Sequence, residues 1–120
     1  MTVGRPLGLL PGHTSSIRRI EAAMLSYQAD MTLRNNPYEL GLDRLVDLDM
    51  AADFVSKAAL TRIREEGASQ LLVGIEFDGS PIVGSNDEHW PITKNGQPVG
   101  RVTSAVYSPR LEKNIALAMV

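Results

Sequence analysis

Residues 99–120 read VGRVTSAVYSPRLEKNIALAMV, and this stretch decides the expected fold of the chain. Residues 101–108 have the composition of a strand, which the pair Ser108-Pro109 ends in a turn. A short loop of basic and acidic residues follows. Residues 114–120 are apolar at nearly every position, as in a strand buried on both faces. The stretch therefore predicts a strand, a turn and a second strand that is apolar on both sides.

Earlier residues carry further strand signals. Residues 71–77 have a period of two and end at Asp78-Gly79, a pair suited to positive φ, so we expect a return strand from Ile82-Val83. Residues 90–94 and 97–102 flank Asn95-Gly96, a second hairpin signal of the same kind. The part of the chain after Gly67 is thus predicted to consist of short antiparallel strands.

A helix is expected near the N-terminus, where Ser15 or Ser16 can cap it. Its apolar positions recur at helical spacing, and its helical character fades by Asp30. The positions predicted to share one face are Ile17, Ile20, Met24 and Tyr27. Asn35-Asn36-Pro37 breaks this pattern, and the loose alternation over residues 38–47 predicts a strand.

A second helix is expected over residues 54–66, with Asp53 as its cap and Gly67 as its stop. The positions expected to face inward are Val55, Ala59, Leu60 and Ile63. The shift from helical to strand patterns near Gly67 is the best internal boundary of the chain.

The composition of the chain excludes several classes of protein. It has 120 residues, of which 43% are hydrophobic and 22% charged, and no run approaches the ~20 apolar residues of a membrane span. Cysteine is absent, so disulfides and thiolate chemistry are excluded. A net charge of -2 argues against a nucleic-acid binder. Because the first residues lack the pattern of a secretory signal, we expect a cytoplasmic protein.

The residues show no motif for nucleophilic or metal-dependent catalysis. His13 and His89 lie far apart in the sequence and outside any ligand-spaced cluster, so we expect both in exposed loops and no metal site. No G-x-S-x-G elbow surrounds any serine. We therefore assign no catalytic residue in this chain.

Two stretches carry a specific family resemblance. Residues 17–31, IRRIEAAMLSYQADM, resemble a helix with R-[LI]-E-A-x-[ML] followed by Y-x-x-D-[MI], which borders the folate channel of the glycine-cleavage T-protein (aminomethyltransferase) family. Residues 99–120 resemble that family's C-terminal barrel. The resemblance implies an α+β fold, in which residues 1–66 are the closing part of the folate-binding domain and residues 67–120 most of a small antiparallel β-barrel, incomplete at both ends.

The same resemblance suggests ligand contacts. Glu21 is expected at the edge of the helix's apolar face, with Arg19 nearly opposite, and a half-buried carboxylate needs a partner. A salt bridge to a neighbouring basic side chain and a direct contact with folate or substrate both remain open. Asn36-Pro37-Tyr38-Glu39 resembles the family's [NT]-P-[FYV]-E turn, whose role is either structural or in lining the channel. The candidate cofactor-binding residues are Glu21, Tyr27, Tyr38 and Glu39.

One departure indicates a branch of the family. T-proteins usually show G-A-R-D before this helix, with the arginine near folate, whereas Ser15 stands at that position here. Residues 35–39, 41–47 and 103–111 also resemble the branch that includes dimethylsulfoniopropionate demethylase. We therefore expect part of a demethylase-like, tetrahydrofolate-dependent one-carbon transferase acting on a small methylated substrate.

Two alternatives remain open at this point. The first is a T-protein-like module of a sarcosine or dimethylglycine oxidase-type flavoenzyme. The second is a stand-alone folate-binding or assembly protein, although the K-G-C-Y-x-G-Q signature of the folate-binding iron–sulfur assembly factors is absent.

The resemblance also implies that the chain is one piece of the enzyme. The family's acid/base motif lies in a part N-terminal to these residues, so the chain alone is expected to be inactive and to bind tetrahydrofolate weakly or not at all. A further strand is expected after residues 114–120. We therefore expect a homodimer or larger species, with the N-terminal helix and the C-terminal strand in its interface.

Overall fold

The structure is a computed structural model that describes residues 3–9 and 15–120. Its main body is a four-stranded antiparallel sheet in the described part of the chain, with the strand order β1-β4-β3-β2. The strands are β1 (Leu72–Phe77), β2 (Trp90–Lys94), β3 (Gln97–Ser108) and β4 (Lys113–Met119). The helical elements are η1 (Arg5–Leu7), α1 (Ser16–Glu21), η2 (Asp43–Leu45) and α2 (Lys57–Glu66). None of the described helices has the length and apolar character that crossing a membrane requires.

The long strands form where the sequence predicts them. The hairpin β2–β3 closes at Asn95-Gly96, where both residues have positive φ, 52° and 78°. β4 is buried at six of its seven positions, which confirms a strand that is apolar on both faces. The predicted barrel is only partly confirmed, because the sheet is open and has β1 and β2 as its edges.

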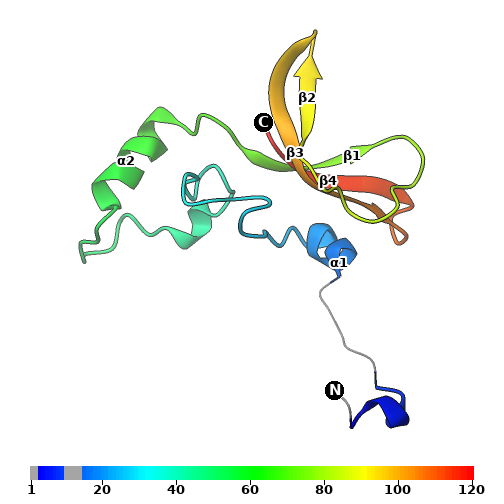
Figure 1. Cartoon of the computed structure of the whole chain (residues 1–120). Helices are drawn as coiled ribbons and strands as arrows, with labels where there is room; N and C mark the ends of the chain where they lie inside the picture. Colours follow the sequence, from blue (N-terminus) through cyan, green and yellow to red (C-terminus); the bar gives the residue numbers. More distant parts are fainter. Residues whose placement is uncertain (1–2, 10–14) are drawn as a thin grey trace.

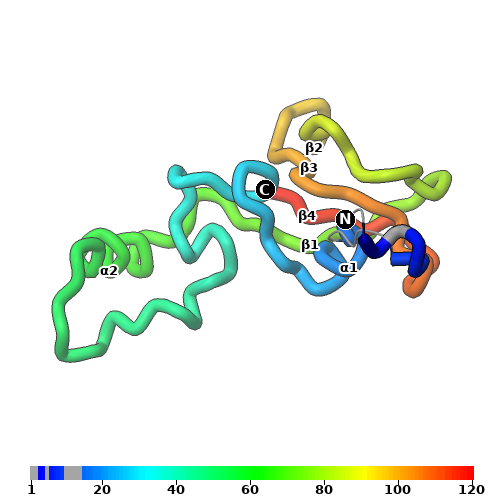
Figure 2. Tube along the Cα trace, turned by 60° about the horizontal axis from the view of Figure 1, so that its bottom comes forward, coloured from blue at the N-terminus to red at the C-terminus, as the bar shows by residue number. Residues whose placement is uncertain are grey.

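The core lies between the sheet and α1. Ile20 of α1 packs against Val106 of β3 and against Ile115 and Leu117 of β4. Figure 1 shows α1 beneath the strands and α2 well apart from them. The tube in Figure 2 shows the same separation from another side.

Two predicted strands are absent from the structure. Residues 38–47 form turns and η2 instead, because Asn36 caps a turn at Tyr38 and Glu39 and the chain reverses again at Gly41, whose φ is 65°. Residues 82–83 lie in the loop between β1 and β2, where Asn114 of β4 binds the Ile82 amide with its side chain. The Ile82 amide thus donates to a side chain instead of to the backbone of a neighbouring strand, and the predicted return strand does not form.

Both predicted helices are shorter than expected. Ser15 caps α1 as predicted, but the helix ends at Glu21, and Ala23 adopts a positive φ of 51°. Met24 and Tyr27, predicted on its apolar face, are exposed. α2 begins at Lys57, without a side-chain cap from Asp53, and ends at Glu66 with Gly67 as its C-cap, as predicted.

The inward face predicted for the second helix is only partly present. Leu60 and Ile63 are half-buried, whereas Ala59 and Val55 are exposed, and none of the residues of α2 is fully buried. The self-association predicted through the N-terminal helix and the C-terminal strand stays a prediction. β4 is paired on both sides, so it does not offer the unpaired strand edge on which that prediction rested.

Gly100 of β3 is needed for the close approach of β3 to the end of β4. A Cβ at this position would clash with the carbonyl oxygen of Met119 and would lie 2.9 Å from the Val120 Cα. We expect Gly100→Ala to lower the free energy of unfolding by about 1–3 kcal/mol, since backbone atoms cannot move aside cheaply. Urea unfolding measures the change, and Gly74→Ala in β1, where nothing lies within 4 Å, is the matched control. Equal stabilities of the two variants would contradict this explanation.

Candidate functional site

A buried ion pair fixes the segment after α1 onto the sheet. Arg19 Nη1 donates to Asp30 Oδ2 at 2.6 Å, and the Asp30 side chain is fully buried. Arg19 Nη2 donates to Ser104 Oγ of β3 at 2.9 Å. The Ser104 and Thr103 hydroxyls lie 2.6 and 2.7 Å from Asp30 Oδ1. Both carboxylate oxygens of Asp30 are therefore engaged, which is the arrangement that a buried charge requires.

The electrostatics of this cluster favour the charged carboxylate. Burial alone raises the pKa of Asp30, but hydrogen bonds from Ser104, Thr103 and the Ser26 amide, together with the charge of Arg19, outweigh it. The pKa of Asp30 consequently lies below the ordinary value of an aspartate. The cluster is an anchor that remains ionised at neutral pH.

Glu21 has a partner other than those expected. Its Oε1 accepts a hydrogen bond of 2.5 Å from Ser108 Oγ, at the end of β3. Ser108 is fully buried, and its Oγ also accepts from the Leu111 amide at 3.1 Å. The salt bridges of the described residues do not include Glu21. The carboxylate of Glu21 therefore ties the end of α1 to the β3–β4 turn.

Glu39 is engaged in a local turn. Its Oε2 accepts from Asn35 Nδ2 at 3.1 Å and from the Asn36 amide at 3.3 Å. In return, Asn36 Oδ1 accepts from the amides of Tyr38 and Glu39. This reciprocal arrangement satisfies the donors of the turn in the manner of a capping box. It favours the structural interpretation of the Asn36-Pro37-Tyr38-Glu39 motif.

The other two candidate residues lie elsewhere. Tyr27 is 55% exposed in the loop after α1, where it bridges to Met31, and Tyr38 is half-buried beside Glu39. Tyr38 and Glu39 share one turn, whereas Glu21 lies at the sheet. The structure therefore does not gather the four predicted contacts around any cavity described below.

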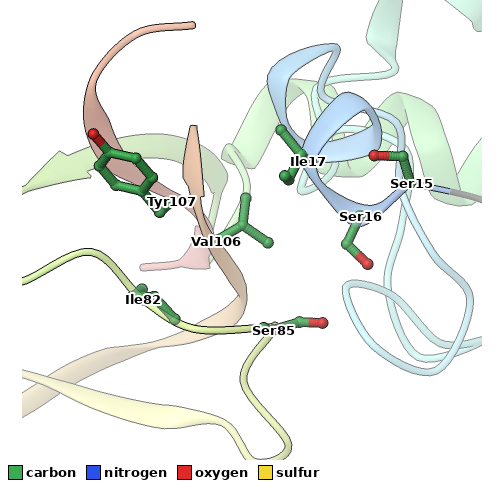
Figure 3. A pocket seen from close by; sticks show the side chains of 8 residues that line it. Ser15, Ser16, Ile17, Ile82, Ser85, Val106 and Tyr107 are labelled. Atoms are coloured by element: carbon green, nitrogen blue, oxygen red, sulfur yellow. The ribbon is translucent and has the colours of Figure 1, made fainter. Parts of the chain in front are cut away.

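A cavity with many hydroxyl groups lies at the start of α1. It has a volume of about 380 Å³ and is lined by Ser15, Ser16, Ile17, Ile82, Gly84, Ser85, Val106 and Tyr107. Figure 3 shows Ser16 and Ser85 on one side of it, Tyr107 on the other, and Ile17 facing Val106. The hydroxyl of Tyr107 points away from the serines in Figure 3, so the polar groups of the cavity are its serine hydroxyls. These can donate and accept hydrogen bonds and suit a neutral polar group.

Two smaller cavities lie side by side along the other flank of α1. The first, of about 280 Å³, is lined by Glu21 and Glu76 and by the apolar side chains of Ile20, Leu111, Ile115 and Leu117, among others. The second, of about 260 Å³, lies between Leu25, Leu40, Leu42 and Arg44 on one side and Leu72, Val73 and Leu117 on the other. Ala23, Gly74 and Leu117 line both. Together the two cavities form one apolar groove, called the α1 groove below.

Sequence reasoning missed the central residues of the anchor. Arg19 was expected on the outer side of a long helix, but α1 ends two residues later and its guanidinium turns to Asp30 and β3. The available signal was the pair Thr103-Ser104, which places two hydroxyls inside an otherwise apolar strand. Buried hydroxyls need partners, and Asp30 supplies one for both.

Comparison with known proteins agrees with this architecture. Residues 71–120 match the family described as the glycine cleavage T-protein C-terminal barrel domain. The aminomethyltransferase of Synechococcus sp. (strain CC9902) is 46% identical over 102 residues, which are 85% of this chain and 27% of that protein. The aminomethyltransferase of Thermotoga sp. (strain RQ2) is 42% identical over 117 residues, 98% of this chain and 30% of that protein.

A solved structure has the same fold. The crystal structure of glycine cleavage system aminomethyltransferase T from Bartonella henselae superposes with a TM-score of 0.74 at 23% identity. The superposition covers 88% of this chain and 29% of that one. The chain spans less than a third of the length of the curated relatives it matches. In residues 71–120, it therefore carries the C-terminal domain of the glycine cleavage T-protein, or aminomethyltransferase, family.

Proposed function

We propose that this chain supplies the C-terminal part of a tetrahydrofolate-dependent one-carbon transferase of the aminomethyltransferase type, with the cytoplasm as its compartment. The observation that carries the proposal is the anchor of Arg19, Asp30, Thr103 and Ser104. It joins the segment that resembles the family's channel-bordering helix to β3 of the matched domain. The two stretches of resemblance thus form one structural unit.

The domain boundary near Gly67 stays part of the proposal, with residues 1–66 derived from the folate-binding domain. The finer branch is also proposed. Ser15 at the position of the family's arginine gives the 380 Å³ cavity a neutral, hydroxyl-rich wall, which supports a demethylase-like member acting on a small methylated substrate.

The hydroxyl groups of the cavity at the start of α1 support the proposal that this chain supplies one wall of a folate site. The hydroxyl-rich cavity is near the lower size limit of small-molecule pockets and would hold part of a folate. Tetrahydrofolate, when bound, accepts the one-carbon unit. Glu21, Tyr27 and Tyr38 stay proposed contacts of folate in the longer enzyme, although none of them lines this cavity. The carboxylate of Glu39 already binds the Asn35 side chain and the Asn36 amide within its own turn.

The chain alone is expected to bind tetrahydrofolate with a dissociation constant of about 1 mM or weaker, because one wall of a site gives little affinity. It is likewise expected to show no turnover of dimethylsulfoniopropionate or dimethylglycine. Calorimetry and a folate-product assay test these two expectations. Micromolar binding or turnover above a no-protein control would mean that the chain carries a complete site.

A chimera tests the proposal more directly. These residues would replace the matching segment of the Thermotoga aminomethyltransferase, which is 42% identical over 98% of this chain. We expect the chimera to be folded and to transfer a one-carbon unit to tetrahydrofolate. Transfer from dimethylsulfoniopropionate would support the demethylase-like branch. A folded chimera without any tetrahydrofolate-dependent activity would contradict the proposed function.

Two variants of the chimera separate ligand contact from structural support. Glu21→Gln is expected to raise the KM for tetrahydrofolate about tenfold, the size of one lost charged hydrogen bond. Ser108→Ala removes the same internal hydrogen bond from the other side and is the matched control, which should keep that KM. If both variants lower thermal stability and neither changes KM, Glu21 has only a structural role.

A further inference from the structure

One side chain takes the place of a strand along the outer edge of β3. β2 pairs with β3 only as far as Trp90 opposite Val102. Beyond that point the buried amide of Ala105 donates to Asn86 Oδ1 at 2.7 Å, and Asn86 Nδ2 donates to the carbonyl oxygen of Thr103 at 3.4 Å. A buried backbone amide needs such a partner. The side-chain amide of Asn86 therefore supplies both the acceptor and the donor that a neighbouring backbone would supply.

A second side-chain amide holds the same loop a few residues earlier. Asn114 of β4 is buried, and its Oδ1 accepts from the Ile82 amide at 3.1 Å. Its Nδ2 donates to the carbonyl oxygen of Ser80 at 3.1 Å. Among the hydrogen bonds of the described residues, none involves residues 83–85. Residues 83–85 are thus a short span between two fixed points, Ile82 and Asn86.

This span belongs to the wall of the cavity at the start of α1. Gly84 and Ser85 line the cavity, and Figure 3 shows the Ser85 hydroxyl on the same side as that of Ser16. Ser85 makes no hydrogen bond of its own to the described residues, and Asn86 follows it directly. The position of the Ser85 hydroxyl at the cavity therefore depends on the contact of Asn86 with β3.

The lining of the cavity indicates which chemical group it takes. Among the described residues that line it, none is charged, whereas the α1 groove includes Glu21, Glu76 and Arg44. A charged group in the cavity would lose hydration without gaining a counter-charge. A neutral polar group can instead exchange hydrogen bonds with the serine hydroxyls. The cavity therefore favours a neutral polar group, and Ser85 is one of the residues that can bind it.

We propose that Asn86 is a positioning residue of this cavity: its amide is fixed to β3 and holds Ser85 where the Ser85 hydroxyl binds a neutral polar group of the ligand. Asn86 itself does not line the cavity, so it acts through Ser85. This inference rests on the proposed function, under which the ligand is tetrahydrofolate.

Titration of the full chain with tetrahydrofolate, followed by nuclear magnetic resonance of the backbone amides, tests the contact. We expect the resonances of Ser16 and Ser85 to move, and the initial slope of the shift gives the relative affinity of each variant even where binding does not saturate. Ser85→Ala should weaken binding about fivefold, the size of one hydrogen bond between neutral groups. Asn86→Ala should weaken it about as much, because it releases Ser85. Ser80→Ala is the matched control: Ser80 is exposed in the same loop and does not line the cavity, so binding should be unchanged.

The double variant Asn86→Ala with Ser85→Ala separates positioning from general structural support. If Asn86 acts through Ser85, the double variant loses about fivefold in affinity, as each single variant does, because the second change removes nothing further. Independent effects would instead multiply to a loss of about 25-fold. Asn86→Asp keeps an acceptor for the Ala105 amide and should lose less affinity than Asn86→Ala. Unchanged amide resonances in β4 show that each variant is folded.

Three results would overturn the inference. Natural affinity in Asn86→Ala would mean that other contacts hold Ser85 in place. Multiplied losses in the double variant would mean that the two residues act independently. Resonances of Ser16 and Ser85 that stay unmoved at several millimolar tetrahydrofolate would mean that the ligand does not enter this cavity. The activity of the chimera tests the proposed function separately, so none of these three results contradicts it.

Discussion

Arg19→Met is expected to lower the free energy of unfolding by about 3 kcal/mol, because it leaves the buried carboxylate of Asp30 without its counter-charge. The Arg19 side chain is 20% exposed and that of Asp30 is fully buried. Methionine keeps the aliphatic stem, so loss of packing contributes little. Urea unfolding measures the change. Arg18→Met, at the exposed neighbouring arginine, should change stability by less than about 0.5 kcal/mol.

The pH dependence identifies the cause of that loss. The pKa of Asp30 is lower in the folded chain than in the unfolded one, so the cluster stabilises the fold above the unfolded pKa of about 4. That stability is lost as the pH falls through the folded pKa. The difference between the natural chain and Arg19→Met should therefore be largest above pH 5 and shrink below pH 4. A difference that stays constant across this range would assign the loss to packing rather than to charge.

The strands after Gly67 could be predicted because their signals are local. Asn95-Gly96 specifies the turn of the β2–β3 hairpin through two positive φ angles, whatever the rest of the chain does. The unbroken apolar run in β4 likewise indicates burial on both faces. The order of the strands was not accessible in this way. β4 lies between β1 and β3, so the last strand is central rather than an edge.

The anchor could not be predicted from spacing alone. Arg19 and Ser104 are 85 positions apart, and the position of Arg19 on an ideal helix places it away from the core. Only the early end of α1 turns it inward. In residues 38–47, the alternation of Leu40, Leu42 and Leu45 was misleading, because the turn at Asn36 took precedence over the strand pattern.

The two candidate carboxylates, Glu39 and Glu21, also differ in how far their partners could be predicted from the sequence. Glu39 lies three residues after Asn36, a spacing that allows the reciprocal turn seen here, so its structural role was available from local sequence. The partner of Glu21 was not, since Ser108 is 87 positions away. A half-buried carboxylate could be predicted to need a partner, but only the fold determines which one it takes.

A matched pair of leucine substitutions compares how much the sheet core and helix α2 each contribute to the free energy of unfolding. Leu117→Ala is expected to cost about 2–5 kcal/mol, because Leu117 is 3% exposed in the core with Ile20, Val106 and Ile115. The same change at Leu60 of α2 should cost about 1 kcal/mol or less, since Leu60 is only half-buried and α2 contacts neither the sheet nor another described helix.

Urea unfolding of the two variants measures both changes. A cost of Leu60→Ala as large as that of Leu117→Ala would show that α2 packs in a core of its own chain, contrary to the separation of helix and sheet described above.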